Sequence, residues 1–281
     1  MSNVQKLVAA AALVVVVVLG VVAYSVLRTP ETASGPITAI PLATSAAAPA
    51  ATDAPAATDA PAATDVPVTA TDVPATADAT PEATVAATAA AAEPTSGAAA
   101  VPASALVAQI LQDESEVRFI IDEVLNNAPF TVVGKTKQVA GEIAVDAQNV
   151  ANTRVGIIQI NARDLATDSE FRDRAIKNRI LNTDQFEFIT FTPTAITGLP
   201  TAGTVGQDYT FQLTGDLTIR DVTKPVTFDV TASSPAANRF AGTAQTTIRY
   251  ADFNITIPQV PQVASVAEEV RLEIDFVAAA P

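Results

Sequence analysis

The clearest pattern in the chain is an alternation of large apolar and polar residues in its second half. Tyr209, Phe211, Leu213, Leu217 and Ile219 occupy every second position apart from Gly215, with threonine, glutamine or aspartate between them. Successive side chains of a strand point to opposite faces, so this spacing predicts a β-strand of about eleven residues with one apolar face.

Further alternating runs lie on both sides of this strand. Val226, Phe228 and Val230 repeat the pattern, and the connection 220–225 is short enough for a hairpin. About eight or nine strands, mostly antiparallel, are expected, and closing such a sheet into a barrel hides its edges most completely. The other predicted strands contain Val117, Phe119 and Ile121; Ile143 and Val145; Ile158 and Ile160; Phe186, Phe188 and Phe191; Ile248 and Tyr250; and Val270, Leu272, Ile274 and Phe276.

One stretch has helical rather than strand periodicity. Thr167 followed by Glu170 has the spacing of a capping box, in which threonine is the N-cap and glutamate is the third helical residue. Residues 171–181 then follow helical spacing, and Asp173 precedes Lys177 by four positions, the favourable order for an ion pair. The pattern therefore predicts one short helix in an otherwise all-β domain.

The N-terminal segment, 1–28, is predicted to be a membrane anchor. Leu7–Leu27 contains no charged residue and would span about 30 Å as a helix, which matches the hydrocarbon core of a bilayer. A cleaved secretory signal is the alternative, although its apolar region is usually shorter. Both interpretations place the rest of the chain outside the cytoplasm, either single-pass and membrane-attached or secreted.

Residues 29–104 are predicted to be a disordered linker. They consist mainly of alanine, threonine, proline and aspartate, with an imperfect repeat of Ala-Ala-Thr-Asp-Ala-Pro, and they contain no phenylalanine. Such a composition buries too little apolar surface to offset the entropy lost on ordering, about 1–2 kcal/mol per residue. The threonine and proline content is also typical of glycosylated stalks. Residues 105–281 are the predicted globular domain.

Composition excludes several classes of function. The chain has no cysteine, histidine or tryptophan, so cysteine- or histidine-based catalysis and zinc fingers are ruled out. With 16 basic against 30 acidic residues and a net charge of −14, the chain is a poor nucleic-acid binder. No cofactor is indicated by the residues, and a binding module or a carboxylate-based enzyme remains.

The order of several short motifs resembles the YceI-like family, polyisoprenoid-binding proteins with a lipocalin-like barrel. The most specific piece is the run 213–226, Leu-Thr-Gly-Asp-Leu-Thr-Ile-Arg-Asp-Val-Thr-Lys-Pro-Val. It is preceded by Phe-Thr-Val-Val-Gly at 130–134, Gly-Glu-Ile at 141–143, Ile-Asn-Ala-Arg-Asp-Leu-Ala-Thr at 160–167, Phe-Arg-Asp at 171–173 and Thr-Phe at 190–191, and is followed by Arg-Tyr-Ala-Asp-Phe-Asn-Ile at 249–255.

The resemblance covers about residues 115–278 and has two departures, Arg174-Ala175 and Phe186-Glu187, where the family usually carries other residues. It implies an antiparallel lipocalin-like β-barrel, here preceded by the transmembrane helix and the linker. It also implies an interior that holds a long isoprenoid chain, no established catalytic residues, and an extracytoplasmic location. Because family members often pair, a homodimer is a candidate assembly.

Large apolar residues of the domain are the candidate ligand-binding residues. Each methylene group that a lipid buries against them would contribute about 0.8 kcal/mol. The alternative is that these side chains simply fill the barrel, as they do in small barrels. The candidates are Phe119, Phe130, Phe171, Phe186, Phe188, Phe191, Phe211, Leu213, Phe228 and Phe253.

Charged residues supply weaker candidates. Arg163 and Arg172 could hold a phosphate headgroup, since a guanidinium matches phosphate geometry. Nearby acids favour the alternative of a solvated helix face. Paired carboxylates at 113–123 and 268–269 could support acid–base chemistry, but no motif joins them. Asn254-Ile255-Thr256 matches a glycosylation acceptor.

Three functions follow from these observations. The preferred one is a membrane-tethered, extracytoplasmic, non-enzymatic protein that binds an isoprenoid or similar long-chain lipid. The alternative is a ligand-free structural or adhesive domain displayed on a stalk. A carboxylate hydrolase is the least favoured, because the chain offers no convincing pair of catalytic groups.

Overall fold

The computed structural model describes residues 24, 28–42 and 105–281, which fall within one compact unit. Apart from Tyr24, the predicted membrane segment Leu7–Leu27 lies outside these residues, and so does the linker from residue 43 to residue 104. Within the ranges that are described, no helix is both long enough and apolar enough to cross a membrane.

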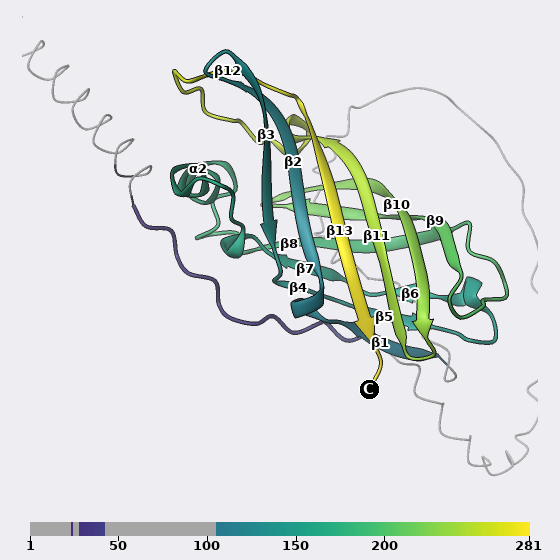
Figure 1. Ribbon diagram of the computed structural model, residues 1–281. Coiled ribbons are helices and arrows are strands. Elements are labelled where there is room, and N and C mark those ends of the chain that lie inside the picture. Colours follow the sequence, from purple (N-terminus) through teal and green to yellow (C-terminus); the bar gives the residue numbers. More distant parts are fainter. Residues whose placement is uncertain (1–23, 25–27, 43–104) are drawn as a thin grey trace, which may run out of the picture. The chain divides into compact units, whose positions relative to one another are not determined.

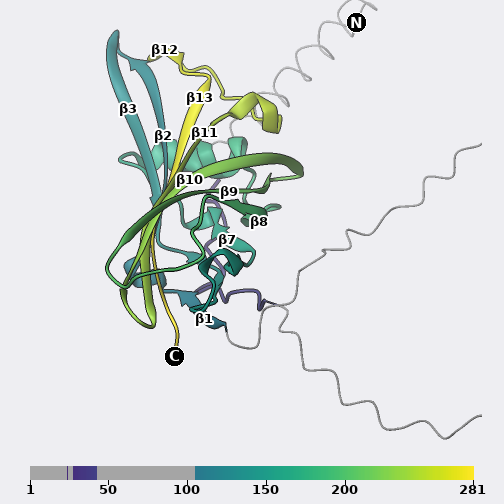
Figure 2. The ribbon, with the colours of Figure 1, turned by 90° about the vertical axis from the view of Figure 1, so that its right-hand side faces the viewer.

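The domain is an antiparallel sheet that curls around an apolar interior (Figures 1 and 2). Pairing runs from β7 through β8, β9, β10, β11, β13, β1 and β5 to β6, which leads directly back into β7. The prediction of an all-β antiparallel fold with one short helix is therefore confirmed, and the curled sheet is a half-barrel, since no pairing among the described residues joins β6 to β7 or β4. The strands are β1 (Leu106–Ile110), β2 (Glu116–Leu125), β3 (Ala128–Thr136), β4 (Val139–Ala140), β5 (Glu142–Val145), β6 (Arg154–Val155), β7 (Ile158–Asn161), β8 (Phe188–Thr197), β9 (Asp208–Ile219), β10 (Val222–Ala236), β11 (Arg239–Arg249), β12 (Val263–Val266) and β13 (Glu269–Ala279).

The predicted hairpin is present as β9 and β10. Its connection is only Arg220-Asp221, because β10 begins at Val222 and continues through Pro225. Arg220 has a φ of 59°, in the left-handed region that a two-residue turn requires. Threonines pair across the outer face, with hydroxyl oxygens 2.9 Å apart for Thr214 and Thr227. Thus polar residues of the alternating pattern face outward and apolar ones face inward.

The helix begins later than the capping box predicts. Helix α2 spans Glu170–Ala175, and Ser169 is its N-cap, with a hydroxyl that accepts a hydrogen bond from the backbone N–H of Arg172. The hydroxyl of Thr167 instead donates to the Asp173 carboxylate at 2.6 Å. A wider π-helical turn, Ile176–Ile180, continues α2. Short 3-10 turns cover Gln112–Glu114, Val150–Asn152, Ala162–Asp164 and Tyr250–Phe253.

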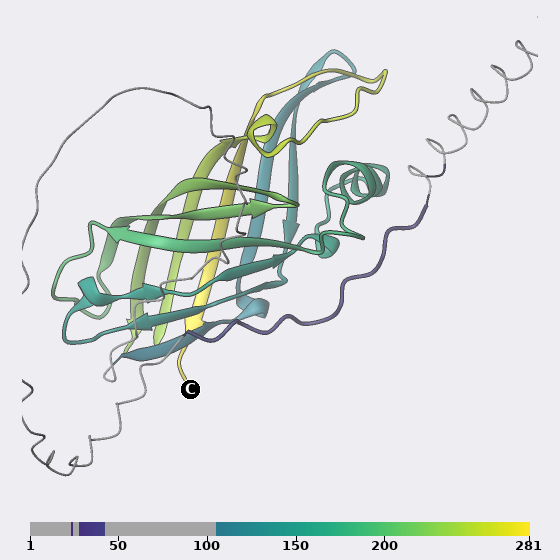
Figure 3. The ribbon, with the colours of Figure 1, turned by 180° about the vertical axis from the view of Figure 1, so that it is seen from behind.

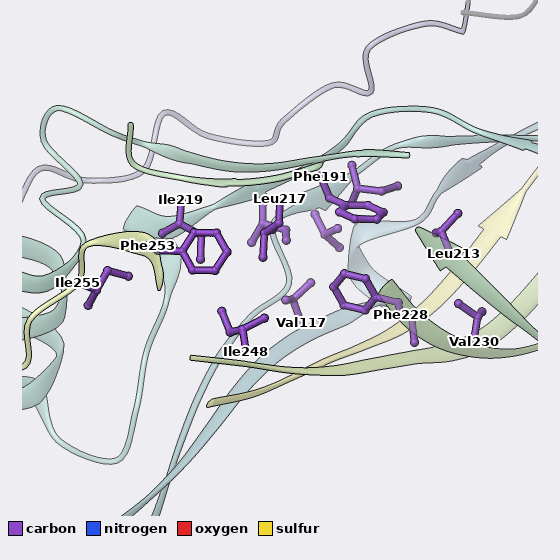
Figure 4. Packing of buried hydrophobic residues seen from close by; sticks show 14 residues of the cluster. Val117, Phe191, Leu213, Leu217, Ile219, Phe228, Val230, Ile248, Phe253 and Ile255 are labelled. Carbon is purple, nitrogen blue, oxygen red and sulfur yellow. The ribbon is translucent and has the colours of Figure 1, made fainter. Parts of the chain in front are cut away.

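The barrel has one end that is filled with side chains. Ile219, Ile248, Phe253 and Ile255 are all less than 10% exposed and pack together there (Figure 4). This end adjoins the helix, because the turn after Ile219 places the Arg220 guanidinium 3.3 Å from the carbonyl oxygen of Ile180. We call it the helix end of the barrel. At this end the side chains fill the interior, as the second interpretation of the apolar residues predicts.

Residues 28–42 form an extended segment along the outside of the barrel, which we call the strap (Figure 3). Their composition predicts a disordered linker, but the structure shows them hydrogen-bonded to the domain. The backbone N–H of Ser34 donates to the Glu187 carboxylate at 2.8 Å, and that of Leu42 donates to the Glu142 carboxylate at 2.8 Å. This part of the predicted linker, residues 29–42, thus contacts the domain.

Candidate functional site

The end of the barrel opposite the helix holds an apolar cavity of about 310 Å³. It is lined by residues from β1, from β5 to β11, from β13 and from the segments 147–153 and 199–205. Its lining consists of aliphatic, aromatic, threonine, serine and glycine residues, and none of them is charged. A cavity with this lining suits an apolar ligand, because an unpaired charge or a polar headgroup buried there would lose hydration without a partner.

Strand β9 runs from the cavity to the filled helix end, and its inward side chains become more buried along the way. Leu217 is 2% exposed and Leu213 is 9% exposed, whereas Phe211 is only partly buried. Phe211 and Leu213 line the cavity, but Leu217 does not. The same alternating face is therefore solid near the helix and hollow toward the other end.

An aromatic pair forms the floor of the cavity. The rings of Phe191 on β8 and Phe228 on β10 lie edge to face, with centroids 5.0 Å apart and an interplanar angle of 73°. Each residue is 4% exposed and each lines the cavity. Figure 4 shows the two rings next to each other. Edge-to-face packing is favourable for aromatic rings, so this pair closes the cavity with a rigid surface.

Four of the predicted ligand-binding residues thus come together around the cavity: Phe191, Phe211, Leu213 and Phe228. Phe253 is 2% exposed and packs inside the helix end instead. The other five predicted residues do not line the cavity. Phe119 lies against Gly134 on β3, Phe130 stacks with Arg172, Phe171 is 58% exposed on α2, and Phe186 and Phe188 are partly buried around the start of β8.

Several lining residues were not among the predicted ones. Ile274 and Phe276 belong to the alternating run of β13, and their inward face could have been selected from that periodicity. Phe240 lies at the start of β11, and Ile110 lies at the end of the short strand β1, where too few residues repeat for a period to show. These four positions line the cavity from β1, β11 and β13.

The mouth of the cavity is shaped by the connection between β8 and β9. Its residue Val205 lines the cavity and is nevertheless 59% exposed, which shows that the cavity opens to solvent here. Two backbone hydrogen bonds hold the connection: Val150 N–H donates to the Thr201 carbonyl at 3.0 Å, and Gly206 N–H donates to the Ser234 carbonyl at 2.8 Å. The mouth is therefore bounded by three segments: the β8–β9 connection, the turn that contains Val150, and the end of β10 at Ser234.

A buried aspartate fixes one of those mouth segments. The Asp146 carboxylate accepts hydrogen bonds from the Asn152 side chain at 3.2 Å and from the backbone N–H of Gln148 at 2.9 Å. These bonds lower the pKa of Asp146, with the Asn152 bond as the largest cause. Because Val145 and Val150 on either side line the cavity, this turn holds the rim in place.

Arg163, a predicted headgroup ligand, is engaged within the protein. It donates to the carbonyl oxygens of Thr183 at 2.9 Å and Asp184 at 3.0 Å. It also pairs with the carboxylates of Glu187 at 3.1 Å and Glu31 of the strap at 2.8 Å. Burial would raise the pKa of Glu187, but hydrogen bonds from Ser34 and Asn161 and the Arg163 charge lower it overall. Arg163 and Glu187 therefore help to bind the strap to the domain.

Arg172, the second predicted headgroup ligand, pairs with Glu123 at 3.2 Å and with Asp168, and its guanidinium lies 5.5 Å from the Phe130 ring centroid. Neither arginine lines the cavity. Several of the carboxylates considered for chemistry are also engaged in ion pairs: Glu116 pairs with Arg118, Glu114 with Arg239 and Glu268 with Arg249. Asn254 is exposed in a left-handed turn.

Comparison with known proteins agrees with this architecture. Residues 109–278 match the model of the YceI-like domain. A UPF0312 protein from Pectobacterium atrosepticum is 30% identical over 164 residues, 56% of this chain and 81% of the relative. One from Vibrio vulnificus is 27% identical over 165 residues, 56% of this chain and 83% of the relative.

A solved structure shares the fold. It is described as a polyisoprenoid binding domain from Saccharophagus degradans implicated in plant cell wall breakdown, and it is 14% identical with a TM-score of 0.50. The alignment covers 63% of this chain and 99% of that one. Since the family model matches more than half of the chain, the protein belongs to the YceI-like family.

Proposed function

We propose that the protein binds an isoprenoid or another long-chain lipid in the barrel cavity and acts as a carrier or reservoir rather than as an enzyme. The observation that carries the proposal is the uncharged cavity above the Phe191–Phe228 pair. The fold shared with a structure described as polyisoprenoid-binding supports it. The hydrophobic segment 7–27 supports an extracytoplasmic protein held at a membrane. Pairing into a homodimer is compatible with this function but not required by it.

The ligand should be selected by the length of its apolar chain. Each additional buried methylene group contributes about 0.8 kcal/mol, equivalent to about a fourfold change in affinity. A cavity of about 310 Å³ has a limited capacity, so this increase should stop once the chain fills it. A short lipid gains too little to offset the cost of association, which is at least about 4 kcal/mol.

The test uses the full chain, purified in detergent, and a pair of variants of neighbouring residues on β10. Ala232→Phe places a ring in the cavity, whereas Thr231→Phe places the same ring on the exposed outer face. Lipid is extracted with organic solvent and identified by mass spectrometry, and uptake of a radiolabelled polyprenyl phosphate is measured in parallel. The two variants share the anchor, so lipid that merely surrounds the hydrophobic segment appears equally in both.

We expect wild type and Thr231→Phe to retain and take up lipid, and Ala232→Phe to lose most of both. Equal lipid in the two variants would contradict a cavity site. No lipid in any of the proteins, together with no uptake, would favour a ligand-free surface domain instead.

A further inference from the structure

The strap is recognised by the domain mainly through its backbone. Asp184 and Glu187 accept hydrogen bonds from the N–H groups of Glu31 at 3.1 Å and Ser34 at 2.8 Å. Asn178 Nδ2 donates to the carbonyl of Arg28 at 2.8 Å, and Gln112 Nε2 donates to that of Ile37 at 2.5 Å. With the Leu42–Glu142 bond, five domain side chains bind the strap's main chain. A surface that supplies both donors and acceptors along its length is built to hold an extended segment.

Side chains add to this recognition at the helix end. Arg28 pairs with Asp184, and Glu31 pairs with Arg163, whose guanidinium side chain is only 13% exposed. Asn178 is itself buried, so removal of the strap would leave its amide without the Arg28 carbonyl. Unpaired buried polar groups are costly, so the docked state is favoured over a free segment.

Exposure along the strap alternates as it does in a strand. The side that faces the domain is partly buried at Ala33, Gly35, Ile37 and Ala39, whereas the residues between them are exposed. The strap is therefore extended, and its two ends lie at different places on the barrel. Its first residue, Arg28, binds Asn178 and Asp184 next to the helix, and its last, Leu42, binds Glu142 at the start of β5 toward the cavity.

Because the strap begins at the helix end, the predicted membrane segment joins the domain there. Leu7–Leu27 ends immediately before Arg28, which binds Asn178 and Asp184, so a bilayer spanned by that segment would lie next to the helix end. The surface of the helix end suits such a position. Phe171 on α2 is 58% exposed, and the acids Asp168 and Glu170 are paired with Arg172 and Arg174. Lys177 and Arg179 make no ion pair with the described residues, so cations exceed acids on this helical segment. An exposed ring and an excess of cations on one helical segment fit the interface of an anionic membrane.

We propose that the strap fixes the orientation of the domain at the membrane, with the helix end against the bilayer and the mouth of the cavity directed away from it. The inference rests on the retained anchor of the proposed function. The lipid would then be exchanged at a surface other than the membrane that holds the anchor. Figures 1 and 3 show the path of the strap from the side of α2 to the region of β1 and β5.

The test uses the full chain in vesicles of phosphatidylcholine and phosphatidylglycerol that contain a headgroup-linked quencher. The chain has no cysteine, so a single fluorophore can be attached either through Gln185→Cys at the helix end or through Ala237→Cys at the mouth. Flotation of the vesicles shows first whether the protein is anchored. We expect both proteins to float, and the label at position 185 to be quenched strongly while that at position 237 is nearly unquenched.

A pair of strap variants tests the cause of this difference. Ser34→Pro with Leu42→Pro removes two backbone donors that bind the domain. Thr32→Pro with Thr38→Pro introduces the same number of prolines at positions whose N–H groups bind none of the described residues. The first pair should bring quenching at the two labels toward the same value, and the second should preserve the difference.

Equal quenching at the two labels in floating wild-type protein would overturn the orientation. Lipid uptake, measured separately with Ala232→Phe as its control, would then still stand. Protein that does not float would overturn the retained anchor and the orientation together. Loss of uptake with the quenching difference intact would refute the cavity ligand alone.

Discussion

The contrast between a solid and a hollow end of one barrel can be measured with two equivalent truncations. Phe253→Ala removes a ring that is 2% exposed and packed on all sides at the helix end. Phe211→Ala removes a partly buried ring that already faces the cavity. The substitution is chemically the same, so a difference in the free energy of unfolding reports the packing around each ring.

The expected magnitudes follow from that packing. A Phe→Ala change in a close-packed core costs about 3–5 kcal/mol, because transfer and cavity terms add. Phe211→Ala enlarges an existing cavity and loses only part of the transfer term, which is about 1.5–3 kcal/mol for full burial. We therefore expect Phe253→Ala to be the more destabilising change by about 2 kcal/mol.

Urea unfolding of the full chain in detergent, followed by far-UV circular dichroism, gives both values by linear extrapolation. Unchanged m-values would show that the two variants unfold from comparable native states. Added polyprenyl phosphate should stabilise Phe253→Ala as much as wild type but Phe211→Ala less. If the two truncations cost the same, or if Phe211→Ala costs more, the barrel is packed throughout and the cavity is not a binding site.

Three further substitutions test individual contacts within the domain. Gly215→Ala should destabilise the domain by about 1–3 kcal/mol, because a Cβ there would lie 2.5 Å from the Thr192 carbonyl oxygen; thermal unfolding measures the loss. Ser169→Ala should cost about 0.5–2 kcal/mol in the same assay through loss of the α2 N-cap. Glu187 has a lowered pKa, so the stability it provides is complete above its ordinary value of about 4.5 and is lost as the pH falls through the folded value. Strap release, followed by proteolysis between pH 7 and pH 3, should increase on acidification, and Glu187→Gln should flatten that dependence.

The sequence predicts the regular part of the fold well because side-chain burial imposes a period of two. The run from Tyr209 to Ile219 and the run from Val270 to Phe276 are long enough for this period to be unmistakable, and both are strands of the barrel. Strands β4 and β6 have two residues each, so no period can show in them. They nevertheless pair with β7 and β5 and form the two ends of the curled sheet.

The strap could not be recognised from composition, for a physical reason. Its partners bind backbone N–H and C=O groups, which every residue other than proline provides equally. Apart from Arg28 and Glu31, whose side chains pair with Asp184 and Arg163, the strap therefore needs no distinctive sequence pattern. The informative residues lie in the domain instead, where Asn178 and Glu187 are polar, largely buried and directed at an extended chain.

The sequence predicts that apolar side chains line the interior, but only four of the ten predicted residues line the cavity. Alternation identifies the inward face, yet it does not say how far along the barrel that face remains packed, and this separates Phe211 from Phe253. For the arginines, residue type alone does not show whether the guanidinium is already bound within the protein. A guanidinium has five N–H donors, and Arg163 directs its own toward two carbonyls and two carboxylates, so little capacity is left for a phosphate. Selectivity at the uncharged cavity should therefore arise from the length and shape of an apolar chain, and lipids that differ only in headgroup should compete almost equally.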